Sequence, residues 1–282
     1  MPYADNDGVS LYYETDGPSE ADTVVLVEGL GYGRWMWRWQ RDRLAERYRV
    51  VVWDNRGTGD SDAPPSDARR AAERGSESPD GAYAIAEMAG DLDAVLDAAG
   101  VDSAHVVGAS MGGMIAQRYA IDYDRADSLG LLCTSPGGDD AVPTPPETRE
   151  RMFDAPEEYD ERETVRYKMA PAMTDEFAER NDDLLADIVD WRLASDADED
   201  AREAQAAGVA AFDAGDRLGD IEVPALVAHG TADRVLPFEN AELLDERLPR
   251  SELEPFEGGS HLFFIEQADA VNERLLAFLD DA

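Results

Sequence analysis

A serine flanked by two glycines is the strongest chemical signal in the chain. The motif runs from Gly108 to Gly112 with Ser110 at its centre, directly after an apolar run typical of a buried strand and directly before a helical pattern. Glycines at these positions allow a tight turn that lifts the serine hydroxyl clear of a sheet, and the amides of the following helix suit a developing oxyanion. The alternative is an ordinary strand–helix turn with a capping serine. The flanking patterns favour a nucleophile at Ser110.

A nucleophilic serine needs a base, and the chain contains three histidines. His105 begins the predicted strand before Ser110 and His229 ends another predicted strand, so we interpret both as structural. His261 lies in a glycine-containing loop between the last predicted strand and the last predicted helix. Because loops at the carboxyl ends of parallel strands carry the chemistry of open α/β sheets, His261 is the predicted base.

The base in turn needs a carboxylate that orients it. The chain has 63 Asp and Glu residues, so position must decide among them, and Asp233 follows the predicted strand that ends at His229. Asp233 therefore lies on the loop one strand–helix unit before His261. The order Ser110, Asp233, His261 is the chain order of serine hydrolases built on an α/β sheet. These three residues are the predicted catalytic set.

Two backbone amides are predicted to form an oxyanion hole. One belongs to Met111, directly after the nucleophile, and the other to Leu30, in a glycine-containing loop after the predicted strand Thr23–Val27. The sequence contains no Gly-x-Gly-x-x-Gly motif, no phosphate-loop lysine and no histidine-rich metal motif. We therefore expect no cofactor and no metal.

Strand and helix patterns alternate along most of the chain, which predicts an α/β fold with a mostly parallel central sheet flanked by helices. The predicted strands are Val9–Thr15, Thr23–Val27, Tyr48–Trp53, His105–Gly108, Ser128–Cys133, Ala225–His229 and Ser251–Pro255. The predicted helices of this part are Trp35–Arg47, Ala84–Ala99, Gly112–Ile121, one from Phe238, and Glu266–Leu279. A Pro-, Ser- and Gly-rich stretch from Asp60 to Gly81 is predicted to be a surface loop.

From Ser135 to about Arg217 the pattern is helical throughout. Predicted helices are Pro145–Phe153, Pro156–Met169, Thr174–Ser195 and Asp198–Phe212. We interpret residues 136–217 as a helical cap inserted above one end of the sheet, and residues 1–135 and 218–282 as the core domain. Eight apolar side chains of this segment are candidates to line an acyl pocket, although we expect most of them to pack cap helices against the core instead. They are Met152, Phe153, Tyr159, Tyr167, Met169, Met173, Phe177 and Trp191. No arginine of this segment stands out as a carboxylate clamp.

Five motifs together give the chain a resemblance to the α/β-hydrolase superfamily over nearly its whole length. They are Gly29-Leu-Gly31 with Trp37, residues 53–61, residues 108–113, residues 229–233 and residues 259–261. The closest resemblance is to the cap-bearing esterase, enol-lactonase and non-haem haloperoxidase branch. It implies a Ser110 nucleophile, a His261 base, an Asp233 orienter and a helical cap over the pocket. The family usually has a histidine before the oxyanion glycine, and this chain has Glu28.

The predicted function is a serine hydrolase that cleaves a small carboxylic ester through an acyl-enzyme intermediate. The partner expected from this chemistry is a small-molecule ester or lactone. One alternative is a lactone, enol-lactone or C–C bond hydrolase. A second alternative is a non-enzymatic binding or sensor protein of the same fold, for which Glu28 is the only hint in the sequence.

The charge of the chain describes its surroundings more than its reaction. A formal net charge of −38 argues against nucleic acid and anionic membrane as partners. Lys168 is the only lysine and acidic residues are spread along the whole sequence, which predicts a halophilic protein, because strong salt screens repulsion between acids. The single Cys133 and the charged, signal-free first twenty residues predict a cytoplasmic location.

Overall fold

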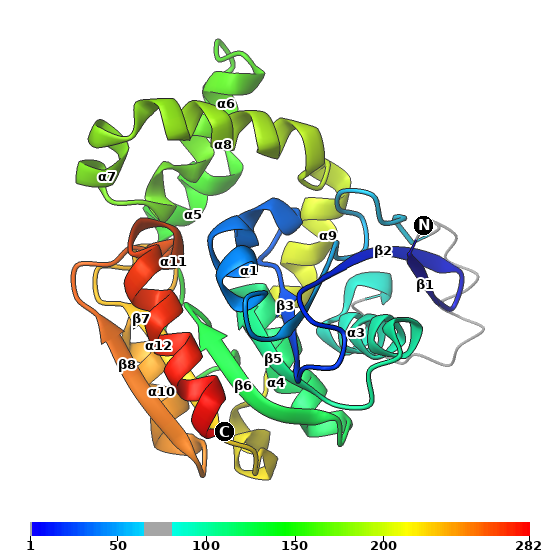
Figure 1. Cartoon of the computed structure of the whole chain (residues 1–282). Coiled ribbons are helices and arrows are strands. Elements are labelled where there is room, and N and C mark those ends of the chain that lie inside the picture. The colour runs from blue at the N-terminus through cyan, green and yellow to red at the C-terminus, as the bar shows by residue number, and fades with distance from the viewer. Residues whose placement is uncertain (1, 65–80) are drawn as a thin grey trace.

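The computed structural model has one eight-stranded sheet in the order β1-β2-β4-β3-β5-β6-β7-β8 (Figure 1). It describes residues 2–64 and 81–282. The strands are β1 (Tyr3–Asn6), β2 (Val9–Asp16), β3 (Thr23–Val27), β4 (Arg49–Trp53), β5 (Ala104–Ala109), β6 (Ala126–Leu132), β7 (Ala225–Gly230) and β8 (Ser251–Phe256). β2 pairs antiparallel with β1 and with β4, and every pairing from β4 to β8 is parallel. The predicted mostly parallel sheet is confirmed.

Continuous apolar runs in the parallel strands bury both faces of the sheet. In β3, Val24 and Leu26 belong to one hydrophobic core, here called the Val24 core, whereas Val25 and Val27 belong to the other, the Val25 core. This alternation is what the two-residue period of a strand requires. Helices that contribute to the Val25 core are α3 (Ile85–Ala99), α4 (Met111–Asp122) and α10 (Glu239–Arg247), and helices that contribute to the Val24 core are α1 (Arg38–Leu44) and α12 (Ala268–Asp281). The sheet is therefore covered on both sides.

The parallel strands bring the predicted catalytic residues to one edge of the sheet. β5, β6, β7 and β8 are paired in sequence and run in the same direction, so their carboxyl ends lie together. Ser110 follows β5 directly, Asp233 lies in the loop after β7, and His261 lies in the loop between β8 and the short helix α11 (Phe263–Glu266).

The chain between β6 and β7 is mostly helical. Its α-helices are α5 (Pro146–Phe153), α6 (Glu161–Met169), α7 (Asp175–Arg180), α8 (Asp182–Ser195) and α9 (Glu199–Ala210). In Figure 1, α6, α7 and α8 lie beyond the sheet at the top of the view, and α9 runs back toward β3. Ile188 of α8 is buried in the Val24 core, while Val209 of α9 packs against the Val25 core. Both cores thus extend into this segment.

The single helix predicted over Thr174–Ser195 is wrong, because two helices, α7 and α8, occupy this range. They meet at Asn181, which has a φ of −126° and a ψ of 41°. Its side-chain amide donates a hydrogen bond to the Phe177 carbonyl at 2.8 Å. An asparagine that bonds the local backbone in this way competes with helix continuation, so α7 ends there.

Two more predicted helices have different bounds. α6 begins at Glu161 rather than at Pro156, because Asp160 and Glu163 form a capping box that fixes the first turn. The helix predicted over Trp35–Arg47 starts as a 3₁₀ helix, η1 (Arg34–Trp37), and continues as α1 only to Leu44. Other 3₁₀ helices are η2 (Gly81–Tyr83), η3 (Ala170–Ala172) and η4 (Gly215–Asp220).

β1 was not predicted from the sequence. Its four residues carry a single buried side chain, Ala4, which is too short a pattern to distinguish a strand from a loop. Residues 65–80 of the predicted Asp60–Gly81 loop lie outside the described residues. Within 2–64 and 81–282, no helix is both long enough and apolar enough to cross a membrane.

Candidate active site

Ser110 occupies the sharp turn between β5 and α4 in a backbone conformation that few non-glycine residues adopt. Its φ is 56° and its ψ is −118°. The Ser110 amide donates to the Leu132 carbonyl at 2.9 Å, and Thr134 Oγ1 donates to the Ser110 carbonyl at 2.7 Å. Surrounding structure must hold such a conformation in place. This strained turn has the geometry of a nucleophile elbow.

Gly108 and Gly112 are required on either side of the elbow because backbone atoms approach them closely. A Cβ atom on Gly108 would lie 2.1 Å from the Gly112 carbonyl oxygen, and a Cβ atom on Gly112 would lie 2.1 Å from the Val27 carbonyl oxygen. Both obstructing atoms belong to the backbone, so no side-chain movement relieves the clash. The two glycines therefore let α4 pack directly against β5 and β3.

His261 is oriented by Asp233, as predicted from chain position. His261 Nδ1 lies 2.7 Å from Asp233 Oδ2, and both side chains are buried. The other carboxylate oxygen, Asp233 Oδ1, accepts hydrogen bonds from the Val235 amide at 2.7 Å and the Leu236 amide at 3.0 Å. The turn after β7 thus holds the Asp233 carboxylate in place, and the carboxylate orients the His261 imidazole through Nδ1. The other ring nitrogen, Nε2, takes no part in this contact and can accept a proton.

Asp233 has a second histidine partner that sequence reasoning missed. His229 Nε2 lies 3.1 Å from Asp233 Oδ2 and 2.9 Å from the Leu236 carbonyl oxygen. Burial alone raises the pKa of Asp233, but the contacts with His261 and His229 outweigh burial and lower the pKa to about 2. Asp233 is therefore ionised at neutral pH. His229 is fully buried, and its four-residue spacing from Asp233 was the available signal for the contact.

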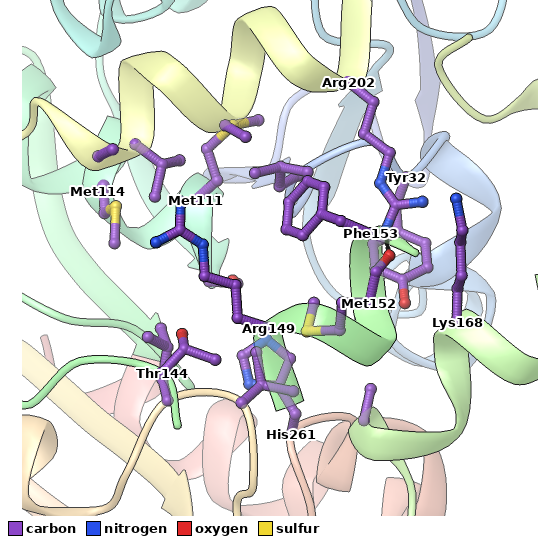
Figure 2. Close-up of a pocket in the computed structure, with 18 of the residues that line it drawn as sticks. Tyr32, Met111, Met114, Thr144, Arg149, Met152, Phe153, Lys168, Arg202 and His261 are labelled. Carbon is purple, nitrogen blue, oxygen red and sulfur yellow. Dashed lines mark hydrogen bonds between the residues drawn. The ribbon is translucent and has the colours of Figure 1, made fainter. Parts of the chain in front are cut away.

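One cavity of about 290 Å³ brings the predicted groups together. Its lining includes Ser110, His261, Leu30 and Met111. Figure 2 labels Met111 and His261 among the lining residues. Asp233 lies behind His261 and does not line the cavity itself. The volume is near the lower end of the range of small-molecule sites.

The loop that carries Leu30 is held by hydrogen bonds on both sides of that residue. The Gly29 amide donates to Met36 Sδ at 3.3 Å, and the Gly31 amide donates to Gln205 Oε1 at 2.7 Å. Gln205 belongs to α9 and also donates from Nε2 to the Arg56 carbonyl at 3.0 Å. Sequence reasoning missed Gln205, which connects the loop to the helical segment between β6 and β7.

Glu28 lies directly before this loop and is completely buried. Neither carboxyl oxygen of Glu28 has a hydrogen-bond partner within the described part of the chain. Burial, with the nearby Asp54 carboxylate adding to it, raises the pKa of Glu28 well above its usual value, which favours the neutral form. The Glu28 carbonyl accepts a hydrogen bond from Asn55 Nδ2 at 3.2 Å, so its backbone still ties the loop to the chain after β4.

Four basic side chains line the cavity, and among the described residues no Asp or Glu lines it. They are Arg149 of α5, Lys168 of α6, Arg192 of α8 and Arg202 of α9. Arg192 Nε pairs with Asp196 Oδ2 at 2.6 Å. Three arginines of this segment thus line the cavity, although none of them stood out in the sequence as a carboxylate clamp. The cluster is assembled from four separate helices, so no local sequence pattern revealed it.

Two of the eight apolar candidates line the cavity, namely Met152 and Phe153. Met169 and Met173 are buried in the Val24 core instead, and Tyr159 is exposed at the surface, where its ring meets Tyr167. Most of the candidates therefore pack elsewhere, as expected. Within residues 2–64 and 81–282, no group of three or more His, Cys, Asp or Glu side chains could hold a metal ion.

A strained serine after one parallel strand, and a His–Asp pair after two later ones, define the hydrolase class built on this kind of sheet. The family model described as alpha/beta hydrolase fold matches residues 22–268. The chain belongs to this family.

Similar proteins have hydrolase names with different substrates. "Putative carbamate hydrolase RutD" of Azorhizobium caulinodans is 32% identical over 281 residues, which cover 99% of this chain and 98% of that protein. An enol-lactonase from Burkholderia xenovorans LB400 is 26% identical with a TM-score of 0.82, and the match covers 99% of this chain and 100% of that chain. An esterase from Exiguobacterium antarcticum is 25% identical with a TM-score of 0.81, covering 99% and 98%.

Proposed function

We propose that this chain is a serine hydrolase that cleaves a small carboxylic ester through an acyl-enzyme intermediate. The observation that carries the proposal is the cavity lined by both Ser110 and His261, with His261 Nδ1 held 2.7 Å from the buried Asp233 carboxylate. A serine in an elbow, a histidine base and an orienting aspartate are the parts that acyl transfer needs.

In the proposed reaction, His261 Nε2 accepts the Ser110 proton as Oγ attacks the ester carbonyl. The carbon–oxygen bond to the alcohol then breaks, and the alcohol leaves with the proton held by His261. Water attacks the acyl group bound to Ser110 and gives its proton to His261. The acyl–oxygen bond to Ser110 breaks, the acid leaves, and the proton returns to Ser110, so the sum is ester plus water to acid plus alcohol.

The Leu30 and Met111 amides are the proposed oxyanion donors. Both residues line the cavity, and the hydrogen bonds of Gly29 and Gly31 fix the loop on either side of Leu30. A donor held in place before the reaction stabilises the developing charge without reorganisation. A Glu28 carboxyl in its neutral form suits this role, because a carboxylate next to the loop would oppose negative charge on the substrate oxygen.

A lactone is the second candidate substrate class, and a carbamate is the third. The enol-lactonase similarity supports the lactone, and the name of the Azorhizobium relative supports the carbamate. All three substrates present a carbonyl to the same nucleophile, so the Ser110 chemistry is shared. In a lactone the leaving alcohol stays attached to the acyl part, and in a carbamate the attacked carbonyl carbon carries a nitrogen.

We further propose that residues 136–217 form a cap over the cavity, because α5, α6, α8 and α9 all contribute lining residues. The acidic composition, with a net charge of −38, supports a halophilic protein. In this proposal the salt adaptation concerns the surface and not the reaction.

Hydrolysis of p-nitrophenyl acetate, butyrate and octanoate, beside a panel of lactones and carbamates, tests this proposal in multimolar KCl. Ser110→Ala should abolish turnover of every substrate that the wild-type chain cleaves. Ser103→Ala removes an exposed hydroxyl directly before β5 and should leave turnover unchanged. Full turnover by Ser110→Ala would overturn the proposed mechanism, and the best substrate of the panel identifies the substrate class.

A further inference from the structure

We propose that the cavity binds a substrate that carries a carboxylate in addition to the carbonyl attacked by Ser110, with Arg202, Lys168 and Arg149 as its anion site. This inference rests on the proposed hydrolase function. The chain has 63 acidic residues against 25 basic ones, yet four basic residues and, among those described, no acidic residue line the cavity. A positive cavity in so acidic a protein favours an anionic ligand by direct electrostatic complementarity.

Arg202 of α9 is the centre of this site. Its Nη2 donates to the Met152 carbonyl at 2.9 Å, and its guanidinium lies 5.2 Å from the centre of the Phe153 ring. Arg202 Nε is buried without a hydrogen-bond partner in the described part of the chain. The stem of Arg202 packs by the oxyanion loop, since a Cβ atom on Gly31 would lie 3.4 Å from Arg202 Cγ. The charge is therefore close to the loop that carries Leu30.

The charge of Arg202 is only partly compensated. Burial, followed by the neighbouring Arg192, lowers the pKa of Arg202, although Asp196 and Glu199 act in the opposite direction. Arg192 itself is already paired with Asp196. A half-buried arginine whose Nε is buried and which has no ion pair with a carboxylate in the described part of the chain costs the folded protein stability, and a bound carboxylate supplies that partner through charge-assisted hydrogen bonds.

Lys168 and Arg149 add two more positive charges to the site. Lys168 is the only lysine of the chain, and Figure 2 shows it on the same side of the cavity as Arg202. A neighbouring hollow is also lined by Lys168, Arg192 and Arg202, together with Asp154, Glu199 and Glu203. The three cations therefore lie near one another, and the carboxylates next to them line this hollow and not the cavity. Arg149 extends into the cavity from α5 and lies nearer to Met111 and Met114, as Figure 2 shows. Neither Lys168 nor Arg149 has a carboxylate partner among residues 2–64 and 81–282, whereas most described arginines do.

Paired esters that differ only in charge provide the test. Mono-p-nitrophenyl glutarate carries a free carboxylate on its acyl part, and p-nitrophenyl pentanoate has the same chain length without it. At one salt concentration, the wild-type kcat/KM should favour the glutarate ester by about 10-fold to 100-fold, the usual size of a hydrogen bond to a charged group. A second pair, pentanoyl esters of 4-hydroxybenzoate and 4-hydroxybenzamide, places the carboxylate on the alcohol part.

Charge-removing variants locate the site. Arg202→Gln should lower the charged-to-neutral ratio of kcat/KM about 10-fold or more, and Arg202→Lys should restore part of it. Arg149→Gln and Lys168→Gln should lower the ratio less. Arg180→Gln is the matched control, because Arg180 is on α7, has a side chain 75% exposed and pairs with Glu176. Arg149 is exposed, so Arg149→Gln should fold normally. It therefore still tests the anion site if Arg202→Gln does not fold.

Binding to Ser110→Ala separates failure of this inference from failure of the proposed function. By titration calorimetry, this variant should bind monomethyl glutarate more tightly than methyl pentanoate by the same 10-fold to 100-fold, and Arg202→Gln in that background should remove the difference. This measurement needs no turnover. Equal binding of both esters, or equal kcat/KM within each pair, overturns the anion site while leaving hydrolysis intact. Absence of turnover together with charge-selective binding overturns the hydrolase function only.

Discussion

The Gly31 amide donates a hydrogen bond of 2.7 Å to Gln205 Oε1, and this contact joins the loop after β3 to helix α9. Gln205 is fully buried and also binds the Arg56 carbonyl and Thr58 Oγ1 through Nε2. One side chain thereby fixes two loops of the core against the helical segment. In the proposed mechanism, Gln205 is a positioning residue for the oxyanion loop.

Gln205→Leu should lower kcat of ester hydrolysis by about 10-fold or more, because a lost oxyanion donor costs about 10²–10³ and a displaced one costs part of that. Gln40→Leu is the matched control. Gln40 is equally buried and donates to the Phe264 carbonyl at 2.7 Å, so its hydrogen bond holds α11 and not the loop that carries Leu30. Both variants should lose stability, measured by chemical denaturation, and only Gln205→Leu should lose kcat. Equal kcat values in the two variants would argue against a positioning role.

Asp233→Asn should lower kcat by about 10³–10⁴ with little change in KM, because an amide no longer holds the neutral histidine in the tautomer that accepts the serine proton. His229→Gln tests the second partner of the carboxylate. It removes the contact at 3.1 Å but leaves His261 in place, so a loss of about 10-fold or less is expected. Steady-state kinetics with one p-nitrophenyl ester measures both. A larger loss in His229→Gln than in Asp233→Asn would reverse the assigned roles.

Relative to the wild type, Glu28→Gln should raise the free energy of unfolding by an amount that grows as the pH rises. The pKa of Glu28 is raised in the folded state, above the value of about 4.3 of an unfolded chain. Protonated Glu28 therefore makes its full contribution to folding stability below the pKa that Glu28 has in the unfolded chain. This contribution is lost as the pH rises through the higher pKa of Glu28 in the folded protein. The maximum slope is about 1.4 kcal/mol per pH unit.

Denaturant unfolding of wild type and Glu28→Gln at pH 5, 6, 7 and 8 measures this difference at constant salt. Glu257→Gln, at an exposed position in the loop after β8, should track the wild type at every pH. A difference between wild type and Glu28→Gln that stays constant over this range would mean that Glu28 titrates normally.

Thermal stability should rise steeply with KCl. A net charge of −38 repels itself across the surface, and the Debye length falls from about 30 Å at 0.01 M to about 3 Å at 1 M. Most of the gain in melting temperature is therefore expected below about 1 M KCl, followed by a slower rise. Scanning calorimetry from dilute buffer to 4 M KCl checks this, and a flat or falling curve would contradict salt adaptation.

Local patterns were sufficient for seven of the eight strands and for the triad candidates. Ser110, Asp233 and His261 each follow a strand pattern and lie two or three residues from a glycine, and the chain order of parallel strands brings such loops to one edge. The sequence alone could not reveal Gln205, because 174 residues separate it from Gly31. The break at Asn181 was missed because the apolar pattern continues through it, and one side-chain hydrogen bond decides the local backbone.

The basic cavity lining was missed for a physical reason of the same kind. Arg149, Lys168 and Arg202 belong to three helices, and each looks like an ordinary surface cation in its own helix. Their shared role depends on how the helices pack, which periodicity does not specify.

Labelling with a fluorophosphonate tests the central claim most directly. After incubation in multimolar KCl, mass spectrometry of the digested wild-type protein should locate one phosphonyl group on Ser110. Ser110→Ala should remain unlabelled, and His261→Ala should react much more slowly although its serine is intact. Labelling elsewhere, or no labelling of a folded wild-type protein, would contradict the assignment of Ser110 as a nucleophile activated by His261.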